Sequence, residues 1–397
     1  MTIINAMNDR HLKSPQTCSV TCNSFIDSLD RRTFIKGLGL VLCSLAAHGG
    51  NGLKQNIYGP TTETDARFFE LVEDKIIQCN QCFRHCMIAP GEAGRCRIRI
   101  NRGGRLITMS YGNPGAVNID PVEKKPFSHV LPGTLTYSVA LIGCNIDCKF
   151  CQNWQIAHAK SGSLRVQSMT PDDVAAGVTK SGCKTISYTY SEPTVWSEYV
   201  LDCADAGLKR GIGSLVISNG TWAPDVLKQL LTRMKAIKID LKSIRADYYR
   251  DVCDGELKPV LDNIMAVRKA GVWLELVNLV VPTLNDSDKE FREMARWIKE
   301  HIGDDVPLHF SRFSPMYKLQ RLSPTPVETL TRARDLALEE GLKYVYVGNV
   351  PQHPGTHTYC PNCKTVVIRR AGYHSVMEKL QGGRCSECDT VIPGVWS

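Results

Sequence analysis

A regular alternation of strand-like and helix-like segments between about residues 136 and 350 constrains the fold of this chain most. Short runs rich in β-branched and aromatic residues lie at 137–142, 185–190, 214–218, 236–241, 273–281, 308–313 and 344–347. Amphipathic stretches lie between most of them, at 172–180, 195–209, 225–234, 259–270, 288–301 and 327–340. Because alternating strands and helices form parallel sheets with right-handed crossovers, six or seven such units predict an α/β protein with a full or partial (β/α) barrel.

The composition excludes two other classes of protein. The chain has 397 residues, of which 43% are hydrophobic and 22% charged, so a disordered chain is excluded. No stretch approaches the ~18 uninterrupted apolar residues that predict a membrane span. The net charge of +8 suits a nucleic-acid partner but does not require one.

The 17 cysteines indicate metal binding rather than disulfides. Eleven of them form three closely spaced groups: Cys79, Cys82, Cys86 and Cys96; Cys144, Cys148 and Cys151; and Cys360, Cys363, Cys385 and Cys388. Such spacings let neighbouring thiolates converge on one ion or cluster. The other six are expected to be buried apolar side chains or unpaired thiols near the N-terminus: Cys18, Cys22, Cys43, Cys183, Cys203 and Cys253.

The three-cysteine loop lies where barrel enzymes carry their chemistry. Cys144, Cys148 and Cys151 form a CxxxCxxC pattern directly after the predicted strand at 137–142, at the C-terminal end of that strand. Three thiolates can hold three corners of a [4Fe-4S] cluster and leave one iron open to a substrate or cofactor. The alternatives are a zinc knuckle, which normally needs four ligands, and a cluster completed by a distant cysteine.

Other polar residues fall at the ends of the next predicted strands. Ser191 and Glu192 follow the second strand, and Asp240 and Lys242 close the fourth. His309 lies on the sixth strand. Residue type alone favours a salt bridge for the Asp–Lys pair and a hydrogen-bonded core position for the histidine.

The pattern CxxxCxΦC, with Phe150 at the aromatic position, resembles the signature of the radical S-adenosylmethionine (SAM) enzymes over roughly residues 130–350. Within that superfamily the chain is similar to the pyruvate formate-lyase activating enzymes, and closer still to the radical SAM member of the AmmeMemoRadiSam system. That similarity rests on the first cysteine group and on the segments 120–126 (DPVEKKP), 143–145 (GCN), 151–154 (CQNW), 188–194 (YTYSEPT), 347–350 (VGNV) and 392–396 (IPGVW).

The resemblance implies a fold and a reaction. The fold is a partial (β/α)6-type radical SAM barrel. The reaction is reductive cleavage of SAM at a [4Fe-4S] cluster, giving a 5′-deoxyadenosyl radical that abstracts hydrogen from a substrate, which in activating enzymes is a protein. The expected partners are a low-potential electron donor, a protein or other macromolecular substrate, and the other AmmeMemoRadiSam proteins.

The resemblance also assigns SAM-contacting roles to residues of this chain. These residues are Phe150, Gln152, Ser191, Glu192, Asp240, Lys242 and His309. Ser191 and Glu192 fall on a Gly-Gly-Glu position that receives the SAM amino group, and Lys242 belongs to an Asp-x-Lys motif that meets the SAM carboxylate. The chain departs from the pattern with Tyr190 and Ser191 in place of the two glycines, which leaves the backbone contacts there open.

The two flanking cysteine groups predict separate metal modules. The C-terminal four form two CxxC knuckles, which predict a zinc-ribbon or rubredoxin-like site, with zinc the first choice. The N-terminal four suit either zinc, toward which the sequence leans slightly, or a second Fe-S cluster that relays electrons.

Arginines crowd the N-terminal module. A hairpin is predicted at 97–100 and 105–109, with Arg95, Arg97 and Arg99 on one strand face and Arg102 and Arg105 nearby. This face is either solvated or a docking patch for RNA or an acidic protein. It motivates the alternative function, an inactive metal-stapled scaffold or RNA-binding protein. Four charged or ionisable residues before the first strand are candidates for the substrate mouth: Glu123, Lys124, Lys125 and His129.

Four parts of the chain are therefore expected. They are an N-terminal extension at 1–67, a four-cysteine and hairpin module at 68–135, the barrel at 136–350 and a metal-knuckle module at 351–397. Within the extension, Arg31 and Arg32 precede an apolar run and resemble a twin-arginine export signal. SAM and low-potential electrons are cytosolic, so we expect a cytoplasmic protein.

Overall fold

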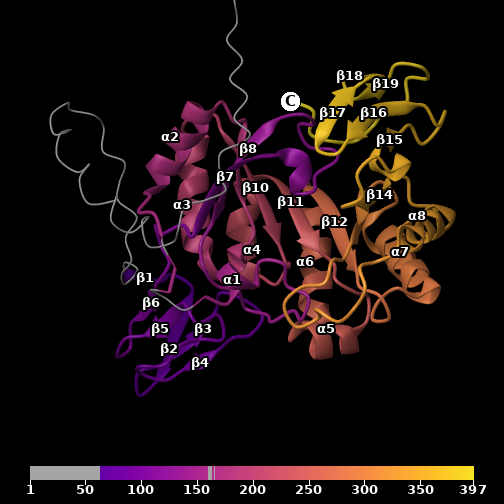
Figure 1. The fold of residues 1–397 in the computed structure, drawn as a ribbon. Helices are drawn as coiled ribbons and strands as arrows, with labels where there is room; N and C mark the ends of the chain where they lie inside the picture. Colours follow the sequence, from indigo (N-terminus) through magenta and orange to yellow (C-terminus); the bar gives the residue numbers. More distant parts are fainter. Residues whose placement is uncertain (1–62, 160–162, 165) are drawn as a thin grey trace, which may run out of the picture. The chain divides into compact units, whose positions relative to one another are not determined.

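An eight-stranded sheet forms the centre of the computed structural model, which describes residues 63–159, 163–164 and 166–397 (Figure 1). Its order is β14-β13-β12-β11-β10-β9-β8-β7. The strands are β7 (Ala116–Pro121), β8 (Leu135–Ala140), β9 (Thr185–Tyr188), β10 (Gly213–Ser218), β11 (Met234–Asp240), β12 (Trp273–Val280), β13 (Leu308–Arg312) and β14 (Val345–Gly348). All neighbours from β8 to β14 are parallel. The seven predicted strands are confirmed as β8 to β14 of one α/β sheet. The edge strands of this sheet are β7 and β14.

The edge strand β7 was not predicted. It pairs antiparallel with β8, so that Asp120 lies opposite Thr136. Its sequence carries an asparagine and ends in a proline, and its exposed Ile119 breaks the pattern of a buried strand. Edge strands tolerate such residues because one side makes no ladder hydrogen bonds.

Helices connect the parallel strands, and the six predicted helices are confirmed, whereas short helices at 154–157 and 246–253 were not predicted. They are α1 (Trp154–Ala157), α2 (Pro171–Ser181), α3 (Ser197–Leu208), α4 (Pro224–Leu231), α5 (Ala246–Cys253), α6 (Leu257–Lys269), α7 (Asp288–Ile302) and α8 (Val327–Glu339), with 3-10 turns η1 (Val122–Lys124), η2 (Pro193–Trp196) and η3 (Pro354–Thr356). Thr170 begins α2 with a capping box to Asp173, which explains its sharp start. The helix predicted at 225–234 is too long, because α4 ends at Leu231 and Met234 already begins β11.

The N-terminal module consists of two three-stranded sheets. These are β1 (Thr64–Asp65), β6 (Leu106–Thr108) and β5 (Arg99–Asn101), and β2 (Phe69–Glu73), β3 (Ile76–Cys79) and β4 (Met87–Ile88). The antiparallel β5–β6 pair confirms the predicted hairpin. The predicted arginine face is wrong: Arg97 has a φ of 67° and breaks the strand, and Arg99 is buried while Arg95 and Arg97 are exposed.

The C-terminal module is built from short antiparallel strands and packs against the edge of the barrel. Its strands are β15 (Thr358–Tyr359), β16 (Val366–Ala371), β17 (His374–Met377), β18 (Leu380–Gln381) and β19 (Arg384–Cys385). The hydroxyl of Tyr346 on β14 hydrogen-bonds Thr358 at 2.9 Å and the ring of His129 at 2.6 Å. Tyr344 and Tyr346 share an apolar cluster with Cys360 and Cys385.

Within the described residues, no helix is both long and apolar enough to cross a membrane. Arg31 and Arg32 lie outside the described part of the chain. The export signal, the cytoplasmic location and the predicted boundaries between the four parts therefore stay predictions.

Candidate active site

One cavity of about 680 Å³ brings together all ten residues predicted for the barrel site. The residues that line it include Cys144, Cys148, Phe150, Cys151, Gln152, Ser191, Glu192, Asp240, Lys242 and His309. Side chains from β10 to β14 line the same cavity, which requires the sheet to curl around it. The arrangement is that of a partial barrel with its polar residues directed inward.

The three-cysteine loop is held by the C-terminal end of α5. The backbone N–H groups of Asp147 and Lys149 each donate to α5 carbonyls at 2.9 Å, those of Cys253 and Val252. Burial raises the pKa of Cys144 well above its usual range. Burial and the neighbouring Cys148 raise that of Cys151 to about 12. Such thiols give up their protons when a metal replaces them.

The donor set of this loop fits a [4Fe-4S] cluster better than a single ion. Cys144, Cys148 and Cys151 line one cavity of about 680 Å³. A closed zinc site normally takes four protein ligands, whereas three thiolates hold three irons of a [4Fe-4S] cluster and leave the fourth iron open.

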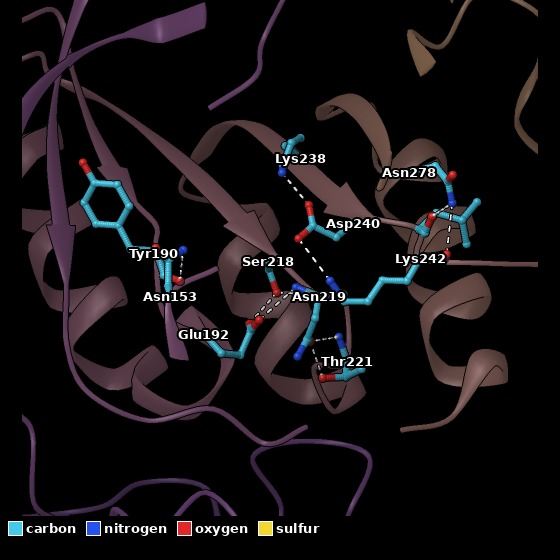
Figure 2. Close-up of polar contacts among 12 residues, drawn as sticks. Asn153, Tyr190, Glu192, Ser218, Asn219, Thr221, Lys238, Asp240, Lys242 and Asn278 are labelled. Atoms are coloured by element: carbon cyan, nitrogen blue, oxygen red, sulfur yellow. Dashed lines mark hydrogen bonds and ion pairs between the residues drawn. The ribbon is translucent and has the colours of Figure 1, made fainter. Parts of the chain in front are cut away.

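Glu192 is a buried carboxylate whose position is fixed by three donors (Figure 2). Oε1 accepts from the Ser218 hydroxyl at 2.6 Å and the Thr194 N–H at 2.9 Å, and Oε2 accepts from the Asn219 N–H at 2.9 Å. Burial raises the pKa of Glu192, and these hydrogen bonds oppose that shift. A carboxylate offers about four acceptor sites, so Oε2 keeps one for a ligand.

Asn219 connects this carboxylate to the cysteine loop. Its side-chain amide donates to Asn145 Oδ1 at 2.8 Å, and the Asn145 amide donates to the Thr221 hydroxyl at 2.8 Å. Asn145 directly follows Cys144. The loop after β10 therefore positions both Glu192 and the cysteine loop.

A row of alternating charges runs along the end of β11. Asp240 lies between Lys238 and Lys242 and pairs with both, the second at 3.3 Å (Figure 2). Burial opposes ionisation, but the two lysines lower the pKa of Asp240 to about 2. The ammonium of Lys242 also lies 5.7 Å from the ring centre of Phe150. Asp240 and Lys242 therefore form a salt bridge with each other and also line the cavity.

His309 lines the cavity but is already hydrogen-bonded. Its Nε2 lies 2.7 Å from Glu275 Oε2, and burial lowers its pKa. Glu275 also accepts from the backbone N–H groups of Ser128 and His129, both at 2.8 Å. His309 thus belongs to a buried network that ties the barrel to the segment before β8.

Three of the four residues predicted for the substrate mouth line the cavity, and their role toward a substrate stays a prediction. Glu123, Lys124 and Lys125 line the cavity. The prediction for His129 is wrong, because its side chain is buried between Tyr346 and the Pro393 carbonyl. Asp120 organises the mouth by accepting from both lysines at 2.7 and 2.5 Å and from the Tyr190 hydroxyl.

Several lining residues were missed by sequence reasoning. Lys238 could have been found, because it precedes Asp240 by two positions on the same strand and so faces the same side. Arg370 and Tyr373 come from the C-terminal module, and nothing in the sequence places that module beside the barrel.

The four C-terminal cysteines form a compact second site. Their sulfurs all lie within 4.8 Å of one another, with Cys360 to Cys388 at 3.5 Å and Cys363 to Cys385 at 3.7 Å. This spacing is that of thiolates around a single tetrahedral ion.

The cysteine loop and most of the parallel sheet fall within a stretch of the chain that matches a known enzyme superfamily. Residues 139–298 match the radical SAM superfamily model. An uncharacterised protein of Methanocaldococcus jannaschii, MJ0808, is 41% identical over 83% of this chain and 98% of its own length. A pyruvate formate-lyase-activating enzyme of Clostridium pasteurianum is 25% identical over 53% of this chain and 91% of its own. Residues 139–298 of this chain therefore form a radical SAM domain.

Among solved structures, a radical SAM methyltransferase from Sphaerobacter thermophilus aligns over 56% of this chain and 68% of its own, with 15% identity and a TM-score of 0.44.

Proposed function

We propose that this protein is a radical SAM enzyme that acts on a protein, in the manner of an activating enzyme. The observation that carries the proposal is the single cavity shared by the cysteine loop, Glu192 and Lys242. When bound, the [4Fe-4S] cluster and SAM supply one-electron cleavage of SAM to a 5′-deoxyadenosyl radical. The chain's own residues bind and orient SAM and exclude water.

Glu192 receives the amino group of SAM. Its Oε2 has an acceptor site left over from the three hydrogen bonds that fix the carboxylate. A preorganised, buried carboxylate loses little freedom when it meets an ammonium. Lys242 lies across the cavity with its ammonium near Phe150 and pairs with the SAM carboxylate.

A protein substrate is supported by the similarity to a pyruvate formate-lyase-activating enzyme, which by its name acts on an enzyme. The cavity is also lined by Lys124 and Lys125, which precede β8, and by Arg370 and Tyr373 of the C-terminal module. We further propose a low-potential electron donor as partner, and association with the other AmmeMemoRadiSam proteins.

The C-terminal four-cysteine site is proposed to hold zinc. Its sulfur spacings of 3.5 and 3.7 Å match a tetrahedral thiolate site. The strands around it carry Arg370 and Tyr373 to the cavity, so the ion supports the site indirectly.

The alternative of an RNA-binding scaffold is not favoured by the arginines that suggested it. Arg95 pairs with Asp254 at 2.6 Å and Arg99 with Glu198 at 2.7 Å. Arg102 and Arg105 pair with other carboxylates at 2.9 and 2.7 Å. Arginines that hold carboxylates offer less charge to phosphates.

The proposed function is tested by SAM cleavage. The protein is reconstituted anaerobically with iron and sulfide, given SAM and dithionite, and 5′-deoxyadenosine is measured with and without candidate protein substrates. We expect product from the natural chain and from Cys183→Ala, a buried thiol outside the three groups, and none from Cys148→Ala. A loaded cluster that yields no product with any candidate would contradict the proposal.

A further inference from the structure

A surface with exposed cations and stacked aromatic rings adjoins the three-cysteine loop. It is formed by that loop, by α1 and by the loop that follows β13. The Lys318 N–H donates to the Lys149 carbonyl at 3.0 Å, and the Lys318 ammonium lies 2.7 Å from Asp147 Oδ2. Lys149 lies between Cys148 and Cys151 in the sequence. We call this surface the cysteine-loop face, and its residues are Arg97, Lys149, Trp154, Tyr317, Lys318 and Arg321.

Trp154 and Tyr317 form the aromatic part of the cysteine-loop face. Their rings are stacked with centres 5.5 Å apart, and His158 also stacks on Tyr317, at 5.4 Å. Trp154 nevertheless stays 37% exposed. Beside these rings, Tyr317, Lys318 and Arg321 line a surface hollow of about 420 Å³. Exposed aromatic rings held in place by stacking, with arginine nearby, are typical of protein contact surfaces.

The cations of the cysteine-loop face carry charge that the described part of the chain does not neutralise. Arg97, Lys149 and Arg321 are exposed, and none of them forms an ion pair within residues 63–159, 163–164 and 166–397. Arg97 Nη1 donates to an uncharged group, the His158 carbonyl, at 3.3 Å. Asp147 already pairs with Lys318. An acidic partner can therefore pair with these cations without breaking an existing ion pair.

The ion pairs beside the cysteine-loop face do not reverse its charge. Arg84 and Arg95 share one carboxylate, that of Asp254, at 2.9 and 2.6 Å. The hydrogen bond from Arg250, and with a smaller effect Lys149, lower the pKa of Asp251. Arg84 and Arg95 also line the separate cavity of about 10 Å³ that the N-terminal cysteines share. These cysteines are Cys79, Cys82, Cys86 and Cys96, and the metal they hold stays a prediction.

We propose that the cysteine-loop face docks the electron donor, a small redox protein with an acidic surface around its redox group. The proposal rests on the proposed function, in which the three-cysteine loop holds the cluster that receives one electron. In that step the donor is oxidised by one electron and the cluster is reduced by one, and no covalent bond forms or breaks. Because electron-transfer rates fall steeply with distance, a surface beside the cluster ligands favours transfer. Opposite charges steer the small, short-lived contacts typical of redox partners.

Donor binding tests the docking surface without reference to SAM cleavage. The probe is flavodoxin, an acidic one-electron donor protein. The double variant Arg97→Gln, Arg321→Gln is compared with a control that loses the same charge elsewhere, Lys180→Gln, Lys228→Gln on α2 and α4. In calorimetric titration at low ionic strength, we expect a roughly 10-fold higher Kd for the double variant, from two lost exposed ion pairs. The control is expected to bind as the natural chain does, and added salt to reduce the difference.

Reduction of the loaded cluster gives a second measurement. Reduced flavodoxin is mixed with the cluster-loaded chain, and the electron paramagnetic resonance (EPR) signal of the reduced cluster is followed over time. We expect slower reduction in the double variant than in the control. Excess dithionite, a small reductant that needs no docking surface, is expected to reduce all three chains to the same extent, which also shows that the variants are folded and loaded.

Equal Kd values and equal reduction rates in the double variant and the natural chain would overturn the proposal. A natural chain that binds no flavodoxin at low salt would overturn it too, as would single-stranded RNA that binds the natural chain more tightly than flavodoxin does and is lost in the double variant. A chain that accepts electrons from flavodoxin but never cleaves SAM would contradict the proposed function instead.

Discussion

At the scale of single residues, the site depends on charged groups that the fold has already positioned. Glu192 is the clearest case, because its three donors come from backbone and side chains that do not need to move. Lys125 and Asp120 at the mouth form a similar buried pair at 2.5 Å. Preorganised groups of this kind bind a ligand without first being ordered.

Replacing Glu192 with glutamine is expected to weaken SAM binding. The substitution removes a charged acceptor worth about 1.5–3 kcal/mol, which corresponds to a roughly 10- to 100-fold rise in Kd. Calorimetric titration of the cluster-loaded chain with SAM measures the Kd of SAM. Glu300→Gln, on the exposed side of α7, serves as the control and is expected to bind as the natural chain does. An unchanged Kd in Glu192→Gln would refute the assigned contact.

Lys125 is expected to lose its proton around pH 8, well below the pH at which an ordinary lysine does. Burial lowers its pKa to about 8 despite the opposing effect of Asp120. The unfolded chain keeps this proton up to its ordinary pKa of 10.5, so the contribution of Lys125 to stability rises with pH between about 8 and 10.5. Acylation rates followed by mass spectrometry across pH 6–10 measure the midpoint. Lys318, whose pKa is raised by a hydrogen bond to Asp147, is the internal control and titrates later. If Lys125 and Lys318 had the same acylation midpoint, the lowered pKa of the buried Lys125 would be contradicted.

At the scale of elements, the loop after β10 shows how strand ends create the site. Gly220 has a φ of 76°, and a Cβ there would lie 2.6 Å from Ile239. Ser218 and Asn219, which hold Glu192, directly precede it. A glycine is required because the backbone is left-handed and closely packed.

Gly220→Ala is therefore expected to destabilise the protein more than the replacement of a left-handed glycine in open space would. Gly211 has a φ of 69° with open space around it, so Gly211→Ala carries only the left-handed cost of about 1–2 kcal/mol. The clash adds about 1–3 kcal/mol at Gly220. Denaturant unfolding of both variants measures the difference. Equal midpoints would mean that the loop relaxes around the added methyl group.

Much of this architecture could be predicted from the sequence. Strand periodicity located β8 to β14, and placing polar residues at strand ends located Glu192, Asp240 and Lys242. The assigned roles of these residues remain predictions. Alternation failed at Arg97, where a left-handed residue reverses the faces that periodicity assigned. It also missed β7, because an edge strand lacks a continuous buried face.

At the scale of the whole molecule, the C-terminal module is part of the cavity wall. Arg370 Nη2 donates to the Ser128 carbonyl at 2.6 Å, and Val395 N–H donates to the His129 carbonyl at 2.7 Å. These contacts join segments more than 240 residues apart. Local sequence patterns carry no information about such docking, which is why Arg370 and Tyr373 were not predicted.

Removing the C-terminal ion is expected to unfold its module but leave the barrel cluster. Structural zinc contributes roughly 10–16 kcal/mol in small zinc-binding peptides, far more than these short strands supply. Cys363→Ser with Cys388→Ser is expected to lose one metal ion and to become protease-sensitive within 358–397, with sulfide content unchanged. Limited proteolysis and metal analysis measure this, with Cys183→Ser as the control. Protease resistance after complete metal loss would show that the module is held by packing alone.

We propose that the three-cysteine loop carries a cluster whose open iron faces SAM in the barrel cavity. EPR spectroscopy of the anaerobically reduced chain, recorded with and without SAM, tests it most directly. We predict that SAM changes the spectrum of the natural chain, and that the change disappears in Cys148→Ala and weakens in Glu192→Gln. Identical spectra with and without saturating SAM, in a chain whose cluster is fully loaded, would contradict the account.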